Sequence, residues 1–321
     1  EFSKTVKVFK LESKRKLRKL QYVRQLIRII KENEIDVVHV HQGNLMPFFL
    51  LIKTACPDVT FYFTVHDTYI FSSDLNEMDR KIANLICKRI IAISDGVVKD
   101  IRSCGIKKEK IKRIYNGINF DKFKMVERKD RKEPFKIINV ARFYPQKKGQ
   151  DVLIKATAIL KERGYRIKII FAGDEPQGVN GEMNRMKELA KAIGVLDNMV
   201  FLGNIQDVNK ELEQADIFCI PSNYEGFGIS AVEAMATGLP CVASNIVGLN
   251  EVVDDSRVGK LFEVGNEIDL ANKLEEVITH IDQYNSSVIS SYARKRFSIQ
   301  NMCEILLEVY GKRENETRTT D

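Results

Sequence analysis

The sequence predicts two α/β domains, each a doubly wound parallel sheet. Short apolar segments alternate with helical segments along the chain, which is the pattern of repeated βα units. The polar stretch "ERKDRKEP" at 127–134 interrupts this alternation once, and the alternation then starts again. A length of 321 residues suits two domains of ordinary size. We therefore predict an N-terminal domain at 1–130, a second domain at 131–298, and a C-terminal helix and tail at 299–321 that could return to the first domain.

The first half of the chain opens with a predicted basic helix and continues with strands. Apolar residues recur at helical spacing in "KRKLRKLQYVRQLIRIIKEN". Four segments then read as buried strands: "DVVHVHQ" (36–42), "TFYFTVHD" (60–67), "RIIAIS" (89–94) and "KIKRIYN" (110–116). We expect Gly117, in the turn after the last of these, to adopt a positive φ.

The second half repeats the alternation with more regular strands. Strands are predicted in "FKIINVARF" (135–143), "RIKIIFAG" (166–173), "NMVFLG" (198–203), "DIFCIPS" (216–222) and "PCVAS" (240–244). Helical segments lie between them, and the chain is mostly helical from Glu267 onward. Two such domains place the carboxyl ends of two parallel sheets around a cleft, where open α/β sheets bind their ligands.

Composition and motifs exclude several classes of protein. The chain is 44% hydrophobic and 30% charged, and no apolar run is long enough to span a bilayer. Six scattered cysteines without a C-x-x-C pair argue against a zinc site or disulfide framework and fit a reducing compartment. No G-x-G-x-x-G and no G-x-x-x-x-G-K-[ST] is present, which argues against a dehydrogenase and a P-loop nucleotidase.

The net charge of +7 is concentrated at the N-terminus. The first 35 residues hold eleven Lys or Arg against four Asp or Glu. We expect a cytoplasmic protein. One interpretation of the basic segment is a solvated helix; the other is a basic face that binds anionic lipid at the inner face of the cell membrane. Nucleic acid is a poorer partner, because no aromatic residues are interleaved with the basic ones. The basic residues concerned are Lys14, Arg15, Arg18, Lys19 and Arg28.

The stretch "PSNYEGFGISAVEAMATGLPCVAS", 221–244, predicts a ligand site at the end of a strand. Gly226 and Gly228 allow a tight turn, and a helix begins near Gly228, with its unpaired amides available to a phosphate. Glu225 and Glu233 lie on either side of that helix start. Carboxylates accept hydrogen bonds from sugar hydroxyls, so a nucleotide sugar, with hydroxyls on both sides of a diphosphate, matches this layout.

The same stretch resembles the E-x7-E signature of the family-4 retaining glycosyltransferases, which have the GT-B fold. "PS-x-x-EGFG" and "EAMA-x-G-x-P" carry the resemblance, which extends over about residues 36 to 310. It implies two Rossmann-like domains facing a cleft, with Glu225 on the donor sugar and Glu233 on the ribose. In "VARFYPQKKG" it implies that Arg142 and Lys148 contact the diphosphate, with Lys147 as a possible substitute. The implied donor-binding residues are Arg142, Lys147, Lys148, Glu225, Gly226, Phe227, Gly228, Ile229 and Glu233.

The resemblance also implies a role for a histidine of the first domain. His66 in "FTVHDTY" stands where the family often has a histidine that contacts the donor sugar near the reacting carbon. The implied catalytic residues are therefore His66, Arg142, Lys148 and Glu225. His41 ends the preceding strand and could reach an acceptor, although a structural role is equally compatible with its position. The N-domain departs from the family, because no counterpart of the first strand and its glycine-rich loop is visible.

These observations together predict a retaining glycosyltransferase. It would move a hexose-type sugar from a nucleotide-diphosphate sugar to a saccharide or lipid-linked acceptor in cell-surface polysaccharide or glycolipid synthesis. We expect no cofactor and no metal, because cations and a helix end can stabilise the leaving diphosphate. The alternative is a non-catalytic GT-B-like binding or scaffolding subunit, which the unusual N-terminus favours and the retained site residues disfavour. A sugar-nucleotide epimerase would not need the glutamate pair.

Overall fold

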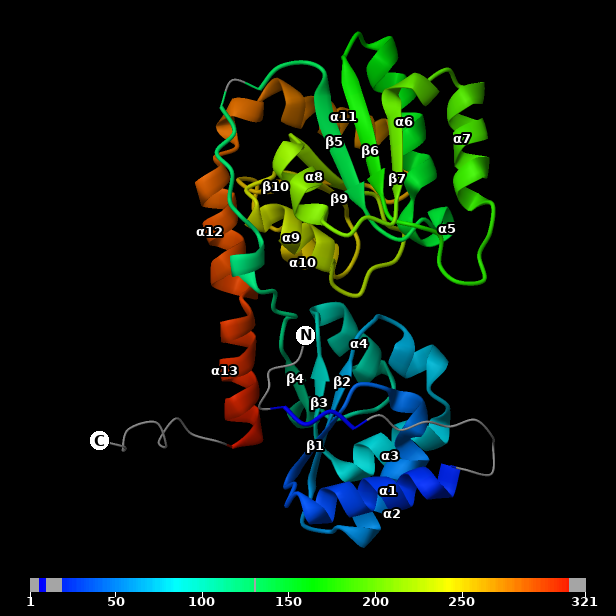
Figure 1. The fold of residues 1–321 in the computed structure, drawn as a ribbon, viewed down its shortest axis with the longest axis vertical. Coiled ribbons are helices and arrows are strands. Elements are labelled where there is room, and N and C mark those ends of the chain that lie inside the picture. The colour runs from blue at the N-terminus through cyan, green and yellow to red at the C-terminus, as the bar shows by residue number, and fades with distance from the viewer. Residues whose placement is uncertain (1–5, 10–18, 130, 312–321) are drawn as a thin grey trace, which may run out of the picture. The chain divides into compact units, whose positions relative to one another are not determined.

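The computed structural model describes residues 6–9, 19–129 and 131–311, and these form two compact units (Figure 1). Unit 1 comprises the described residues up to 92 together with 100–112, and unit 2 comprises 93–99 and the described residues from 113 onward. Residues 93–99 belong to unit 2 through Glu251, whose carboxylate accepts hydrogen bonds from the backbone amides of Asp95 and Gly96 at 2.8–3.3 Å.

Unit 1 contains a four-stranded sheet in the order β1-β2-β3-β4. The pairs β1–β2 and β2–β3 are parallel, and a helix follows each strand from β1 to β3, as expected of βα units. The strands and helices are α1 (Lys19–Glu32), β1 (Val37–Val40), α2 (Met46–Ala55), β2 (Thr60–Val65), α3 (Glu77–Ile86), β3 (Cys87–Ala92), α4 (Asp95–Ser103) and β4 (Ile111–Arg113). The boundary falls within the last two elements, since residues 95–99 of α4 and Arg113 of β4 belong to unit 2. Single short helical turns occur at η2 (Gly43–Leu45), η3 (Ile70–Asp74) and η4 (Lys108–Lys110).

The outer strands of this sheet differ from the prediction. Both were predicted as buried strands, yet β1 is only half-buried along most of its length and β4 is three residues long with two exposed residues. Each lies at an edge of the sheet that the structure describes, where one side of the strand has no neighbour. The central strands β2 and β3 are the buried ones, as predicted.

Helix α1, the part of the basic segment that the structure describes, is amphipathic as predicted. Val23 and Ile30 are buried, whereas Arg24 and Arg28 are exposed and Arg28 pairs with Glu32 at 3.1 Å. Leu20 departs from the pattern, because it is 62% exposed. The basic residues Lys14, Arg15 and Arg18 lie outside the described residues.

Unit 2 contains a six-stranded sheet in the order β10-β9-β8-β5-β6-β7, with parallel pairing throughout. Its main elements are β5 (Phe135–Val140), α6 (Gln150–Glu162), β6 (Ile167–Ala172), α7 (Glu182–Ala192), β7 (Met199–Gly203), α8 (Val208–Gln214), β8 (Ile217–Ile220), α9 (Ile229–Ala236), β9 (Cys241–Ser244), β10 (Gly259–Phe262), α11 (Glu267–Thr279), α12 (Ser286–Phe297) and α13 (Ile299–Tyr310). Shorter turns are η5 (Phe120–Lys122), α5 (Pro145–Lys148), η6 (Leu196–Asn198), α10 (Leu249–Val252) and η7 (Ile281–Gln283).

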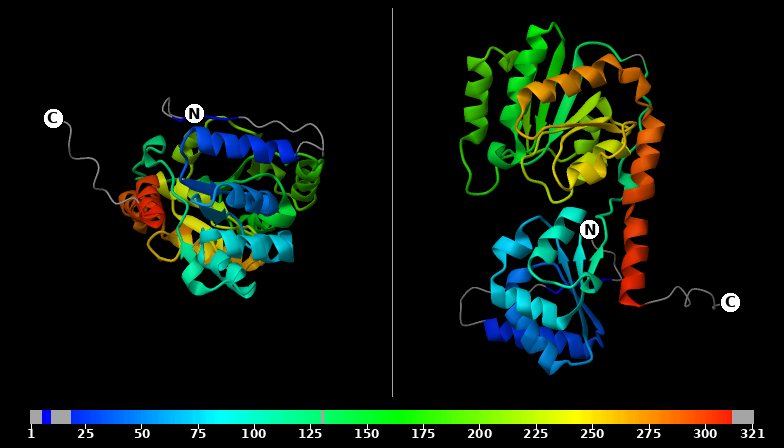
Figure 2. Two further views of the ribbon diagram at one scale, coloured as in Figure 1. Left: turned by 90° about the horizontal axis from the view of Figure 1, so that it is seen from below. Right: turned by 180° about the vertical axis from the view of Figure 1, so that it is seen from behind.

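Helices cover both faces of this sheet, which confirms the doubly wound architecture. Helices α6 and α11 pack side by side, and α12 packs against α9 (Figures 1 and 2). Strands β6 and β8 are almost entirely buried apolar residues, because both of their faces lie under helices. The five strands predicted for this half are all present, whereas β10 and the short α5 and α10 were not predicted.

The predicted linker segment is held to unit 2 at Arg128. Its guanidinium donates hydrogen bonds to the carbonyl oxygens of Leu212, Ala215 and Thr237 at 2.6–2.9 Å. Burial lowers the pKa of Arg128 to about 10, with the charge of Arg131 adding to the effect. The segment predicted as a linker is therefore bound to unit 2 at its start by these hydrogen bonds.

The expectation for Gly117 was wrong. Its φ is not among the positive values, and the glycine is required for another reason. A Cβ at this position would lie 2.6 Å from the Cα of Ile299 and 2.7 Å from the carbonyl oxygen of Ser298. The backbone of the turn thus passes directly against the start of α13, an approach that only glycine permits.

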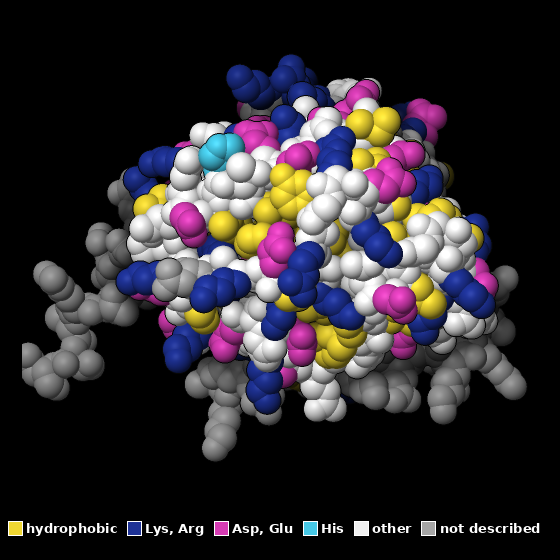
Figure 3. Space-filling model, turned by 90° about the horizontal axis from the view of Figure 1, so that it is seen from above, with side chains coloured by type: hydrophobic (Ala, Val, Ile, Leu, Met, Phe, Trp, Pro, Cys, Tyr) yellow, Lys and Arg dark blue, Asp and Glu magenta, His cyan; other side chains and the backbone are white. Residues whose placement is uncertain are grey.

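The surface of unit 2 carries charges of both signs. On the face seen in Figure 3, Lys and Arg side chains alternate with Asp and Glu, and hydrophobic side chains emerge only in small groups. No helix in the part of the chain that the structure describes is long and apolar enough to span a membrane.

Candidate active site

The candidate site is built where the order of the strands in unit 2 reverses. Strand β5 lies between β6 and β8, and the chain fills the sheet from β5 outward in one direction before returning to β8. Ligands of doubly wound sheets bind outside the carboxyl ends of the strands at such a switch point. Arg142 follows the end of β5 closely, and Pro221 directly follows β8. Both predicted motifs therefore begin at this point.

The lysine-bearing turn α5 is docked on the loop that follows β8. Gly149 ends the turn with φ +65°, and a Cβ there would lie 1.9 Å from the carbonyl oxygen of Pro221. The backbone amide of Asn223 donates to the carbonyl of Lys147 at 2.9 Å, and its side-chain amide donates to the carbonyl of Gln146 at 3.0 Å. Backbone contacts therefore position the two loops against each other.

This docking brings Lys148 and Glu225 together. The Nζ of Lys148 lies 2.5 Å from Oε2 of Glu225, and only 16% and 17% of the two side chains are exposed. The hydroxyl of Ser222 donates to the same carboxylate oxygen at 3.4 Å. An ion pair shielded to this degree is stronger than one at the open surface, because water screens it less. One predicted cation and one predicted carboxylate thus form a single charged cluster.

Arg142 lies at the same edge of the sheet, but its side chain, unlike that of Lys148, forms no ion pair within the part of the chain that the structure describes. Its side chain is exposed, and its guanidinium has no hydrogen-bond partner among the described residues. Its backbone is held by Gln150, a fully buried side chain that donates to the Arg142 carbonyl at 3.0 Å. Arg142 is therefore a cation on a fixed backbone whose donors are available to an anion. Lys147 contributes its carbonyl to the docking of the loop.

Helix α9 begins where the sequence predicted, next to the charged cluster in the chain. Gly228 caps the helix with φ +95°, and Ile229 is its first residue and is 44% exposed. The amides of a first helical turn have no intrahelical acceptor, which suits them to an anion. Gly226 is packed against Gly248, where a Cβ would lie 3.0 Å from the Gly226 carbonyl. These glycines therefore fix the path of the loop.

Phe227 is placed differently from its neighbours. Its side chain is 2% exposed and stacks on Tyr115 with a centroid distance of 5.4 Å, while Phe297 contacts it edge-on at 5.4 Å. This aromatic cluster anchors the loop that joins β8 to α9. Any contact that Phe227 makes with a ligand is therefore limited to its backbone.

Glu233 lies on α9 with a half-buried side chain. Burial raises the pKa of its carboxyl group above the usual range, and no residue of the described chain donates a hydrogen bond to the carboxylate. A partly buried carboxylate without a hydrogen-bond donor is less stable than one in water or one bound by a donor. This is the state expected of a residue whose partner is a ligand.

The histidine predicted from the resemblance lies in unit 1, at the end of β2. Nε2 of His66 lies 2.7 Å from Nδ1 of His41, which follows β1, and the two ring planes are inclined by 27° with centroids 5.0 Å apart. His39 stacks on His41 at 4.4 Å, and its Nε2 lies 2.6 Å from the hydroxyl of Thr64. Three histidines thus form one row across two neighbouring strands.

The protonation of this row is biased toward neutral rings. Burial lowers the pKa of His39 to about 4, with the charges of His41 and His66 adding to the effect. Burial also lowers the pKa of His41, and burial followed by the charge of His41 lowers the pKa of His66. No group of His, Cys, Asp or Glu in the described part of the chain is arranged to hold a metal ion.

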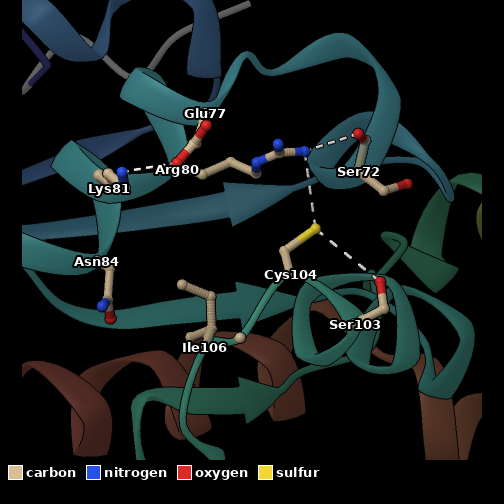
Figure 4. A pocket seen from close by; sticks show the side chains of 9 residues that line it. Ser72, Glu77, Arg80, Lys81, Asn84, Ser103, Cys104 and Ile106 are labelled. Carbon is tan, nitrogen blue, oxygen red and sulfur yellow. Dashed lines mark hydrogen bonds and ion pairs between the residues drawn. The ribbon is translucent and has the colours of Figure 1, made fainter.

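A separate pocket of about 420 Å³ lies in unit 1 between α3 and the end of α4 (Figure 4). Arg80 points into it, but its Nη1 donates to the Ser72 carbonyl at 2.7 Å, and Lys81 pairs with Glu77 at 2.6 Å. Cys104 lies 3.9 Å from the guanidinium. The cations are thus already bound within the protein, and none of the predicted site residues lines this pocket.

Several residues of the site had not been predicted. Ser222, Gly149 and Gln150 support the charged cluster, and the partnership of His41 with His66 was not foreseen. A signal for Gly149 was present, because a glycine directly after the lysines permits a left-handed turn. Contacts across 25 or 77 positions depend on strand order, which local patterns do not reveal.

The fold and the site together define a glycosyltransferase of the GT-B type. Residues 120–296 match the family described as glycosyl transferases group 1, and residues 2–122 match glycosyltransferase family 4. The chain belongs to the group 1 glycosyltransferases and is a glycosyltransferase.

Individual proteins resemble this chain over most of its length. An uncharacterized 41.2 kDa protein in the cps region of Klebsiella pneumoniae is 28% identical over 89% of this chain and 81% of its own length. The alpha-monoglucosyldiacylglycerol synthase of Streptococcus pneumoniae is 25% identical over 90% of this chain and 67% of its own. The structure of Anabaena Alr3699/HepE in complex with UDP has a TM-score of 0.79 at 22% identity, over 91% of this chain and 82% of that one, and shows the shared fold.

Proposed function

We propose that the chain is a retaining enzyme that transfers a hexose-type sugar from a nucleoside-diphosphate sugar to a saccharide or lipid-linked acceptor. The process it serves would be the synthesis of cell-surface polysaccharide or glycolipid. The relatives support this range of acceptors by name, since one is a glycolipid synthase and another is encoded in a cps region. The UDP complex of the Anabaena protein supports a nucleotide-sugar donor.

The observation that carries the proposal is the cluster at the β5–β8 switch point. Lys148 and Glu225 form a shielded pair, Arg142 presents an unpaired guanidinium at the same edge, and α9 begins at Ile229, four residues after Glu225. Glu233 lies one turn further along that helix without a partner. Cations, amides and two carboxylates on these elements are the kinds of group that a diphosphate between two sugars would bind.

The chemistry follows from the charge that the reaction creates. When the bond between the sugar and the diphosphate breaks, negative charge accumulates on the leaving phosphate. Arg142, Lys148 and the α9 amides would stabilise it, and each well-placed donor contributes about 3 kcal/mol in comparable sites. Glu225 would accept hydrogen bonds from sugar hydroxyls, and Glu233 from the ribose hydroxyls. His66 would contact the donor sugar near the reacting carbon.

The test is a turnover assay with defined donors. The full chain is incubated with a panel of UDP-, GDP- and ADP-sugars and candidate acceptors, and release of the nucleoside diphosphate is followed. The anomeric configuration of the product is then read by proton NMR. We expect one donor to be turned over with retained configuration and without any effect of a chelator.

Matched variants separate the site from the rest of the surface. Arg142→Met and Lys148→Met should each lower turnover about a hundredfold, as for loss of an oxyanion donor. Lys191→Met, on the exposed surface of α7, should have no effect. Inversion of configuration would refute the retaining mechanism. A strict magnesium requirement would refute the metal-free leaving-group role, as would full turnover in both site variants.

A further inference from the structure

The row of histidines in unit 1 contains a hydrogen bond whose chemistry is tightly constrained. Strands β1 and β2 are parallel neighbours with Val40 opposite Phe63, so the residues that follow each strand emerge at the same edge. Nδ1 of His41 and Nε2 of His66 are 2.7 Å apart there. Two ring nitrogens at this distance need one proton between them, because two protons or two lone pairs would repel each other.

Only two neutral arrangements satisfy this contact. In one, His66 donates from Nε2 to Nδ1 of His41, and both rings carry their proton on Nε2. In the other, His41 donates from Nδ1, and both rings carry their proton on Nδ1. The Nε2-protonated form is the intrinsically more stable tautomer of a histidine ring, so the first arrangement is favoured. It leaves Nδ1 of His66 with a free lone pair that can accept a hydrogen bond.

The surroundings hold this arrangement in place. His39 stacks on His41 with centroids 4.4 Å apart and lies within hydrogen-bond distance of the Thr64 hydroxyl, so His39 and His66 both contact the His41 ring. The partial burial of the row lowers the pKa of all three histidines, which keeps them neutral near pH 7. Neutral rings are the condition under which one nitrogen of each can accept.

We propose that His41 is a positioning residue for His66. Its Nδ1 accepts the Nε2 proton of His66, and it thereby fixes both the orientation of the His66 ring and the tautomer that presents Nδ1 as an acceptor to a donor-sugar hydroxyl. This inference rests on the role of His66 in the proposed function. A neutral imidazole can take this part because one of its ring nitrogens accepts a hydrogen bond while the other carries the proton.

The direct test is the tautomeric state of the rings, read from long-range ¹H–¹⁵N spectra of the full chain near pH 7.5. The chain has four histidines, which makes assignment by single substitution practical. We expect His66 to be protonated on Nε2, with a downfield proton from the nitrogen–nitrogen hydrogen bond. In His41→Phe, which keeps an aromatic ring but has no acceptor nitrogen, that signal should disappear. His280→Phe, in unit 2, is the matched control and should leave the His66 signals unchanged.

Kinetics supply the second readout. His41→Phe should lower kcat by about tenfold, because small displacements of a group that contacts the reacting substrate slow the reaction by about this much or more. The affinity for the nucleoside diphosphate should stay unchanged. His41→Gln offers an oxygen acceptor to the Nε2 proton and should recover part of the loss. Protonation of His66 on Nδ1, or a His66 spectrum that does not change in His41→Phe, would overturn the inference.

Unchanged kcat/KM in His66→Phe would also overturn it, because His66 would then have no role for His41 to support. Failure of the proposed function is recognised separately: the parent chain would turn over no sugar nucleotide, while the spectra would still report the pairing.

Discussion

The ion pair between Lys148 and Glu225 should couple two loops that are distant in the sequence. The two atoms are 2.5 Å apart, and about a sixth of each side chain is exposed. A hydrogen bond between charged groups contributes about 1.5–3 kcal/mol, while a fully exposed pair contributes about 0.2–1 kcal/mol. The shielding of this pair places its expected coupling energy in the upper range, at about 1.5–3 kcal/mol.

A double-mutant cycle measures this coupling. Lys148→Met keeps the aliphatic stem, and Glu225→Gln keeps the shape of the carboxylate, so each change removes the charge with little repacking. Urea unfolding of the full chain can be followed by circular dichroism, because the sequence has no tryptophan. The exposed pair of Lys81 and Glu77, 75% and 72% exposed, is the matched control and should couple by less than about 0.5 kcal/mol. Additive effects of the two site variants, at the level of the control, would refute the pairing.

Three further results are expected. Burial raises the pKa of Glu233, so above the ordinary carboxyl pKa the folded state keeps a proton that the unfolded state has lost. The free energy of unfolding therefore falls as the pH rises through this window. Glu233→Gln, which carries no charge, should raise Tm at pH 7 without ligand, and a lower Tm would contradict this. The pKa of His39 is lowered from 6.5 to about 4, so between these pH values the unfolded state binds more protons than the folded state. The free energy of unfolding should therefore fall on acidification, by about 2 kcal/mol after allowance for solvent screening. His39→Gln should flatten this dependence of the unfolding free energy on pH in urea titrations, and an unchanged dependence would exclude His39 as its cause. The chain should co-sediment with anionic but not with neutral vesicles, and high salt should release it. A variant in which four basic residues are replaced by glutamine should lose this binding. Equal binding of the parent chain to both vesicle types would show that charge is not responsible. That variant replaces the basic residues Lys14, Arg15, Arg18 and Lys19.

Periodicity predicted most of the architecture because strands such as β6 and β8 are buried on both faces and read as continuous apolar runs. The edge strands were misjudged because an apolar segment does not indicate whether a neighbour covers it. Strand β10, "GKLF", was missed because four residues with a lysine carry little periodic signal. Gly117 shows the same limit, since its close contact with Ile299 depends on a helix 182 positions away.

The candidate site was predicted as a set of residues, without their contacts. Glu225, Gly228 and Glu233 lie on one continuous stretch, so local reasoning could place them around a helix start. The pairing of Lys148 with Glu225 could not be predicted in that way, because it depends on β5 lying next to β8 in the sheet. The pairing of His41 with His66 depends in the same way on the register of β1 and β2.

The central claim is that unit 2 binds a nucleoside diphosphate at the β5–β8 switch point and holds its ribose with Glu233. Isothermal titration of the full chain with UDP, GDP, ADP and TDP tests it most directly. We predict that one of them binds and that Glu233→Gln weakens its affinity about ten- to hundredfold, which corresponds to about 1.4–2.7 kcal/mol. The matched control Glu188→Gln, on the exposed surface of α7, should bind like the parent. Binding of none of the four, or equal affinity in Glu233→Gln and the parent, would contradict the claim.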